Sequence, residues 1–148
     1  MVVDVTTEAV LDHPRVLVAA FAGDPANAPR WYANIDGVEW LTSPPLVVGS
    51  RLAFRARFLG RILEYVYEVV EYEPGRRLAM RTEQGPFPME TTYTWDDAGE
   101  GRTLMTLHNS GEPSGFAAVT APAMAAAIRR ANRRDLARLA RELAPRKS

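Results

Sequence analysis

The sequence contains no cysteine. This absence excludes a disulfide framework, a cysteine-based metal site and a cysteine nucleophile. Histidine is scarce as well, because His13 and His108 are the only two and stand far apart in the chain. Most acidic residues fall at positions that would face outward on the predicted strands. A transition-metal site needs several such ligands close together, so we expect neither a metal nor another cofactor.

The sequence also lacks a formal net charge and a long apolar run. A neutral chain has no general attraction for nucleic acids or anionic membranes, so no nucleic-acid partner is expected. The longest apolar stretch, "VLVAAFAG", is far shorter than the ~20 residues of a membrane-spanning helix, which predicts no transmembrane segment. The start "MVVDVTTEAVLDHP" has no basic region before an apolar run and is unlike a signal peptide. We therefore expect a cytoplasmic protein.

Signature motifs for phosphate and nucleophile chemistry are missing too. The sequence has no P-loop, dinucleotide-binding or nucleophile-elbow pattern. The segment "DDAGEG" is typical of a hairpin turn, since it lacks the spaced acids of a calcium loop. What is present, 148 residues of which 47% are hydrophobic and 24% charged, indicates one ordinary globular domain spanning residues 1–148.

The first part of the chain predicts a strand followed by two short helices. The β-branched segment "VVDVTTEAVL" is typical of a strand. Asp12 or His13 can then cap a helix that has Pro14 in its first turn and ends at Gly23. Its apolar residues at helical spacing are Val16, Leu17, Ala20 and Phe21. A second short helix is expected at residues 30–34.

Residues 38–108 alternate apolar and polar side chains in strands that turn signals separate. The side chains expected on one inner face are Leu52, Phe54, Ala56, Phe58, Leu63, Tyr65, Tyr67, Val69, Leu78, Met80, Met89, Thr91, Tyr93 and Trp95. In the hairpin of "RLAFRARF" and "LEYVYEVV", arginines on the outer face pair with glutamates across the ladder. The facing of the last strand, residues 103–108, stays open because Leu104 and Met105 are adjacent and both apolar.

A long amphipathic helix is expected at residues 121–143. Its apolar stripe consists of Met124, Ile128, Leu136, Leu139 and Leu143. Arginines fill much of the remaining surface, and we interpret this as a solvated outer face supported by Asp135 and Glu142; attraction of an acidic partner or of lipid headgroups is the alternative. The element order predicts an α+β fold in which this helix lies across an antiparallel sheet.

Several of these segments resemble the START-like (SRPBCC) superfamily, in its polyketide cyclase/dehydrase-like branch. The matching features are Trp31-Tyr32, "VVGSRLAF", "YEPGRRL" at residues 72–78, "GRTL" and a terminal "DLARL", and the resemblance covers nearly the whole chain. It implies a helix-grip, Bet v 1-like fold. A curved antiparallel sheet of about seven strands would wrap the C-terminal helix, with two short helices after the first strand and a deep, mostly apolar cavity between sheet and helix.

The resemblance implies a ligand cavity. The alternation of inward- and outward-facing residues along each strand indicates which side chains line it. The expected lining is Trp31, Phe54, Phe58, Tyr65, Tyr67, Met80, Met89, Thr91, Tyr93, Trp95, Phe116, Met124 and Ile128. The alternative is that these side chains interdigitate and fill a solid core. The hydroxyls of the tyrosines and of Thr91 would orient a ligand oxygen, or bond to backbone and water. We interpret Trp40 as structural.

The leading hypothesis is binding of a small hydrophobic or aromatic molecule, lipid-like or polyketide-like, in that cavity. One alternative is a polyketide cyclase or aromatase, in which His108 at the rim and Tyr93 would be the candidates for proton transfer. The other is a protein-interaction module resembling the activators of chaperone ATPases. The apolar lining favours binding over catalysis, and homodimer formation stays open.

Overall fold

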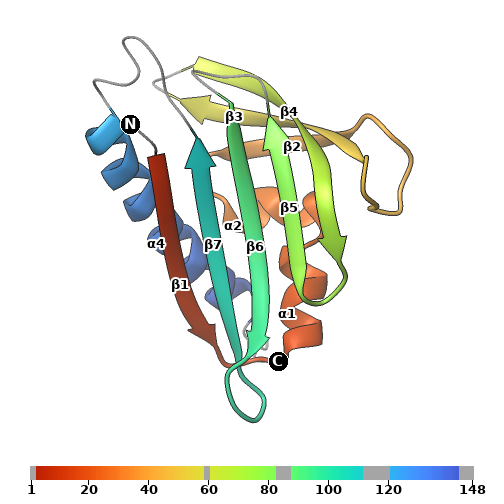
Figure 1. Cartoon of the computed structure of the whole chain (residues 1–148), viewed down its shortest axis with the longest axis vertical. Coiled ribbons are helices and arrows are strands. Elements are labelled where there is room, and N and C mark those ends of the chain that lie inside the picture. The colour runs from red at the N-terminus through yellow and green to blue at the C-terminus, as the bar shows by residue number, and fades with distance from the viewer. Residues whose placement is uncertain (1–2, 59–60, 83–87, 112–120, 144–148) are drawn as a thin grey trace.

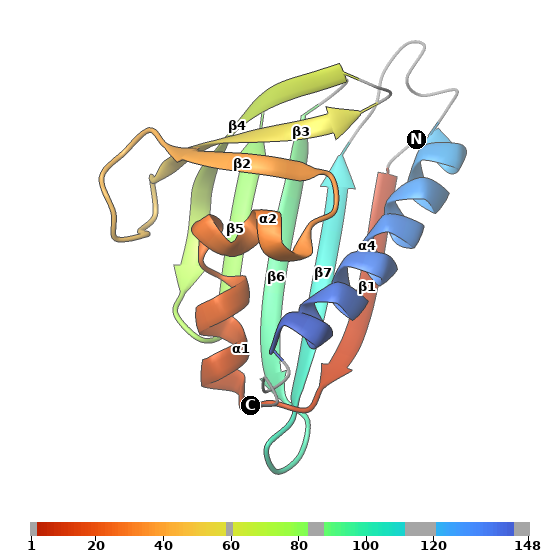
Figure 2. The ribbon, with the colours of Figure 1, turned by 180° about the vertical axis from the view of Figure 1, so that it is seen from behind.

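The computed structural model describes residues 3–58, 61–82, 88–111 and 121–143. It shows a seven-stranded antiparallel sheet with helices packed on one of its faces (Figures 1 and 2). The elements are β1 Val3–Leu11, α1 Arg15–Ala22, the 3-10 turn η1 Pro25–Asn27, α2 Ala28–Trp31, β2 Ile35–Trp40, β3 Arg51–Phe58, β4 Arg61–Glu73, β5 Arg77–Thr82, β6 Met89–Asp97, β7 Thr103–Gly111 and α4 Ala121–Leu143.

The strands are ordered β1-β7-β6-β5-β4-β3-β2, so consecutive strands from β2 to β7 pair as a meander and β1 closes against β7. Strands β2 and β3 turn across the ends of the others, which gives the sheet a concave face (Figure 2). Helices α1, α2 and α4 all lie on that face, with α4 against β1. The expected helix-grip architecture is therefore confirmed.

The alternation of side chains in the sequence matches the two faces of the sheet. In the β3–β4 ladder, Arg51 is the register partner of Glu68 and Arg55 that of Glu64, while Leu52 and Phe54 are buried on the other side. Strand β7 buries Thr103, Met105 and Leu107 on the concave face. This settles the facing of the last strand, which adjacent apolar residues had left open.

The short helices differ from the expectation in their ends and in the buried face. Helix α1 begins at Arg15 and no side chain caps it; Asp12 instead forms an ion pair with Arg102, with 3.3 Å between Oδ1 and Nε. Val16 and Leu17 are exposed, and the buried residues of this helix are Val18, Ala19 and Ala22. The hydroxyl of Thr103 donates to the carbonyl of His13 at 2.7 Å, which ties the start of α1 to β7 and fixes which side of the helix faces inward.

The second helix begins and ends earlier than expected. Pro25 and Pro29 stand within the first two positions of η1 and α2, where the missing N–H of proline costs no hydrogen bond. Asp24 caps η1 by accepting from the N–H of Ala26 at 3.0 Å. The chain is therefore already extended at Ile35, where β2 begins.

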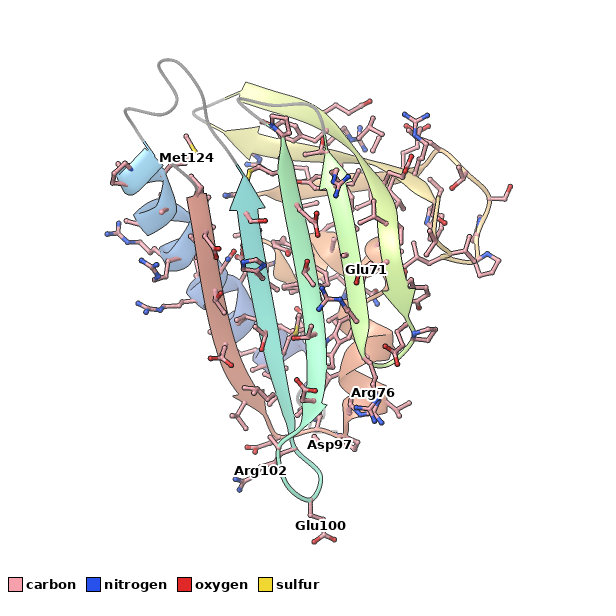
Figure 3. The ribbon with its side chains drawn as sticks, viewed as in Figure 1. Glu71, Arg76, Asp97, Glu100, Arg102 and Met124 are labelled. Carbon is pink, nitrogen blue, oxygen red and sulfur yellow. The ribbon has the colours of Figure 1, made fainter. Side chains whose placement is uncertain are left out.

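Two apolar clusters fill the space between sheet and helices. The larger one contains Trp31, Trp95, Leu136 and Leu139, and the smaller one contains Val3 and Val5 with Met89, Met124, Ala125 and Ile128 packed around them. Met124 lies at the opposite end of the molecule from the turn that carries Asp97 and Arg102 (Figure 3). Among the described residues no helix combines the length and apolarity needed to span a membrane.

Leu139→Ala tests whether the apolar face of α4 packs against the core. Leu139 is fully buried, so the substitution removes apolar contacts and leaves a void, which should lower the free energy of unfolding by about 2–5 kcal/mol in urea denaturation. Arg133→Ala, on the exposed side of the same helix, is the control and should change that free energy by less than about 0.5 kcal/mol. Equal effects of the two substitutions would contradict this packing.

Candidate functional site

A cavity of about 140 Å³ lies on the concave face of the sheet, beside the end of α2. Its lining consists of Tyr32, Ile35, Phe54, Tyr67, Met80, Thr91, Tyr93 and Asn109. Every strand from β2 to β7 contributes at least one of these side chains, because the meander brings their inner faces together. Phe54, Tyr67, Met80, Thr91 and Tyr93 were expected from the strand parity to line such a cavity, and the structure brings them together.

The other expected lining residues lie elsewhere in the described structure or outside it. Trp31 is fully buried behind Tyr32, with 4.1 Å between the stacked ring centroids, and Trp95 lies deeper in the core. Tyr65 is half-buried and does not line the cavity. Met89, Met124 and Ile128 belong to the smaller apolar cluster. The side chain of Phe58 and the whole of Phe116 lie outside the described residues.

Three lining residues were missed by the sequence reasoning. Tyr32 is adjacent to Trp31, and Trp31 was expected in the lining where the structure has Tyr32. Ile35 was placed between elements, whereas β2 begins there. Asn109 was placed in a loop after His108, whereas β7 continues to Gly111. Extending the alternation of Met105 and Leu107 by one step would have found it.

The hydroxyls of Tyr32 and Tyr93 form a hydrogen bond at one side of the cavity. The Trp31 ring stacks on Tyr32 and meets Tyr93 edge-on, so this aromatic cluster fixes the position of both hydroxyls. Burial raises the pKa of Tyr32 and of Tyr93 well above the usual value. Both side chains are therefore neutral at physiological pH and act as hydrogen-bond donors and acceptors.

A row of polar side chains runs from α4 to the wall of the cavity. Asn132, 6% exposed, donates from Nδ2 to Oδ1 of Asn109 at 2.7 Å. Asn109 donates from Nδ2 to Oγ1 of Thr91 at 3.1 Å, and the Thr91 hydroxyl lies close enough to Tyr67 to counter part of the effect of burial on the pKa of that phenol. Burial raises the pKa of Tyr67 as well, so this side of the cavity is also uncharged. We call Asn132, Asn109, Thr91 and Tyr67 the polar row.

Asp135 departs from the sequence interpretation, which placed it on a solvated outer face. It is only 3% exposed and accepts a hydrogen bond from the N–H of Ala33 at 3.2 Å, just after α2. This bond ties α4 to the segment that carries Tyr32. Burial raises the pKa of Asp135, although the Ala33 N–H and Arg134 favour the charged form. Because arginines surround Asp135 in the sequence, the helix was expected to expose this position to solvent.

His108 lies on the other face of β7 from Asn109. Its Nε2 is 2.8 Å from Oδ1 of Asp4, on the outer side of the β1–β7 ladder. It is therefore turned away from the cavity, whereas Tyr93, the second candidate for proton transfer, lines it. Among the described residues no group of three or more acids or histidines is placed to hold a metal ion.

This architecture matches a known family. Residues 2–144 match the family model described as "Polyketide cyclase / dehydrase and lipid transport". The chain belongs to this family. No protein among the curated sequences matches it at a significant level.

Bacterial and plant proteins are among the solved structures that superpose on this chain. The Zhui aromatase/cyclase from Streptomyces sp. R1128 superposes with a TM-score of 0.82 at 18% identity, over 97% of this chain and 94% of that one. TTHA0849 from Thermus thermophilus gives a TM-score of 0.78 at 17% identity, over 95% and 96% of the two chains. The major latex-like protein 151 from Panax ginseng gives 0.77 at 14% identity, over 98% and 99%. At these identities the likeness establishes the helix-grip fold alone.

The buried carboxyl of Asp135 predicts a pH dependence of stability. Because its pKa is raised in the folded state, the folded protein binds this proton more tightly than the unfolded chain does. The stability that it contributes is thus fully present below the unfolded pKa of about 4 and is lost as the pH rises through the folded pKa. Asp135→Asn keeps an oxygen for the Ala33 N–H and removes the titration.

We therefore expect the Asp135→Asn variant to be more stable than the wild type at neutral pH, with the difference shrinking as the pH falls toward about 4, where the carboxyl of an unfolded chain takes up its proton. Urea denaturation of both proteins across this range measures it. Glu142→Gln, an exposed change on the same helix, serves as the control. A stability difference that stays constant with pH would contradict the raised pKa.

Proposed function

We propose that this protein binds a small hydrophobic or aromatic molecule in the cavity between the sheet and the helices. The observation that carries the proposal is the composition of the cavity wall. Ile35, Phe54 and Met80 supply apolar surface, and hydroxyl and amide groups converge from two sides without any charged side chain among the described lining residues. Burial of apolar ligand surface contributes about 25 cal/mol per Å², and the polar groups orient the ligand.

A cyclase or aromatase activity is the second candidate, and one observation favours it. Tyr32, Tyr67 and Tyr93 converge on one space and can donate protons there, as an enzyme that handles a carbonyl compound would require. Proton abstraction also needs a base, and the raised pKa values keep these three tyrosines protonated at neutral pH. The described wall thus supports binding better than turnover.

Ligand binding can be followed by the emission of the native tryptophans. Trp31 stacks on Tyr32, whose ring lines the cavity, so a bound ligand should alter the Trp31 environment. We expect titration with single-ring aromatics, flavonoid-like compounds and fatty acids to change the emission and raise the thermal unfolding temperature for at least one class. If no class changes either quantity, the proposal is wrong.

A pair of isoleucine substitutions tests whether the ligand occupies this cavity. Ile35→Trp places a large ring in the cavity and should weaken binding more than tenfold in isothermal titration calorimetry, because the ligand and the new side chain compete for one space. Ile62→Trp introduces the same change at a side chain that is 66% exposed, and should leave the affinity unchanged. Equal affinities of the two variants would place the ligand elsewhere.

A further inference from the structure

The size of the cavity limits what it can hold. An apolar protein cavity of about 150 Å³ binds one benzene molecule. The cavity described here, at about 140 Å³, therefore matches a single ring with a small substituent. A sterol, a long acyl chain or a polycyclic polyketide would extend beyond the space that the described residues enclose.

The hydrogen bonds of the cavity wall leave two hydroxyl protons uncommitted. In the Tyr32–Tyr93 bond either oxygen can donate, and in both cases the other hydroxyl keeps its own proton. Thr91 and Tyr67 also carry one hydroxyl proton each, and the Asn109 amide, which donates to Thr91, takes up neither of them. A hydrogen bond between Thr91 and Tyr67 would use only one of these two protons. One O–H donor therefore remains in each pair, and among the described residues neither pair makes a further hydrogen bond to an acceptor. Burial raises the pKa of Tyr32 and of Tyr93, and the Asp135 carboxylate lies near enough to both to add to that effect.

The two donors face the same space. Tyr32, Tyr93, Tyr67 and Thr91 all line this cavity. Tyr67 and Tyr93 are close enough that a negative charge on one raises the pKa of the other. An acceptor oxygen placed between them would complete both hydrogen bonds, whereas an anionic ligand would meet no charged partner among the described lining residues.

We propose that the cavity selects an uncharged single-ring molecule whose carbonyl oxygen accepts hydrogen bonds from the hydroxyl groups of the wall. This inference rests on the proposed function and adds the chemical class of the ligand. The polar row serves as a positioning device: Asn132, anchored on α4, holds Asn109, and Asn109 holds Thr91 beside Tyr67. The carbonyl group, and not the ring alone, then determines which ligand binds.

Two probes of the same shape test the proposal. Acetophenone carries a carbonyl where α-methylstyrene carries a methylene group, so the two differ mainly in the acceptor oxygen. The ratio of their affinities, measured by calorimetry and compared between protein variants, isolates the hydrogen bonds from the hydration of the free probes. Each neutral hydrogen bond contributes roughly a three- to tenfold preference for the ketone.

The structure predicts an unusual pattern for the variants. Tyr32→Phe alone frees the Tyr93 proton and should keep most of the ketone preference, whereas Tyr32→Phe combined with Tyr93→Phe should lose about three- to tenfold of it. Affinity for α-methylstyrene should stay the same in both, which also shows that each variant folds with its cavity intact. Tyr65→Phe, a half-buried tyrosine outside the lining, is the matched control and should leave the ratio unchanged.

A measurement on the wild type makes the test independent of variant folding. The infrared carbonyl stretch of bound acetophenone, taken from an isotope-edited difference spectrum, should lie below its position in hexane, because two O–H groups donate to the oxygen. A stretch at the hexane position, or an affinity ratio that is the same in the wild type and the double variant, overturns the inference while leaving binding intact. If neither probe binds the wild type, binding of a single-ring ligand itself is contradicted.

Discussion

The hydrogen bond from Asn132 to Asn109 is the constraint on which the inner arrangement of this protein depends. It joins α4 to the sheet in the middle of an otherwise apolar contact, with Ile128 and Leu136 one turn away on either side. A buried amide without a partner costs about 1–3 kcal/mol. Sliding the helix by one turn, about 5.4 Å, would leave the Asn132 amide and the Oδ1 atom of Asn109 without this hydrogen bond, so the bond favours one position of the helix along the sheet.

The same bond explains where the cavity lies. The polar row separates the two apolar clusters, and its Thr91 and Asn109 side chains are too short to fill the space that Phe54 and Met80 leave open. The space is therefore bounded by apolar side chains along its length and by hydrogen-bonding groups at two sides. Burial keeps the tyrosines protonated, so the wall offers donors without charge.

Periodicity predicted most of the fold and part of the site. Alternation identified Thr91 and Tyr93 as inward-facing because the pleat of a strand enforces a period of two. The inward position of Tyr32 was not predicted, because the single helical turn before it has too few residues to show which face is apolar. Asp135 was misassigned because charged residues are rarely buried, and its hydrogen bond to the Ala33 N–H joins segments far apart in sequence. Asn132 interrupts the apolar stripe of α4, and this polar residue at an inward position was the sequence signal for a buried hydrogen bond.

We propose that the space beside the polar row binds one ring. A crystal structure of the protein with 4-bromophenol tests this most directly, because the anomalous signal of bromine locates the ligand without reference to the protein coordinates. We expect a single bromine position among Ile35, Phe54 and Met80, with the phenol oxygen between Tyr67 and Tyr93. A cavity that stays empty while bromine binds at the smaller apolar cluster or on the outer face would contradict it.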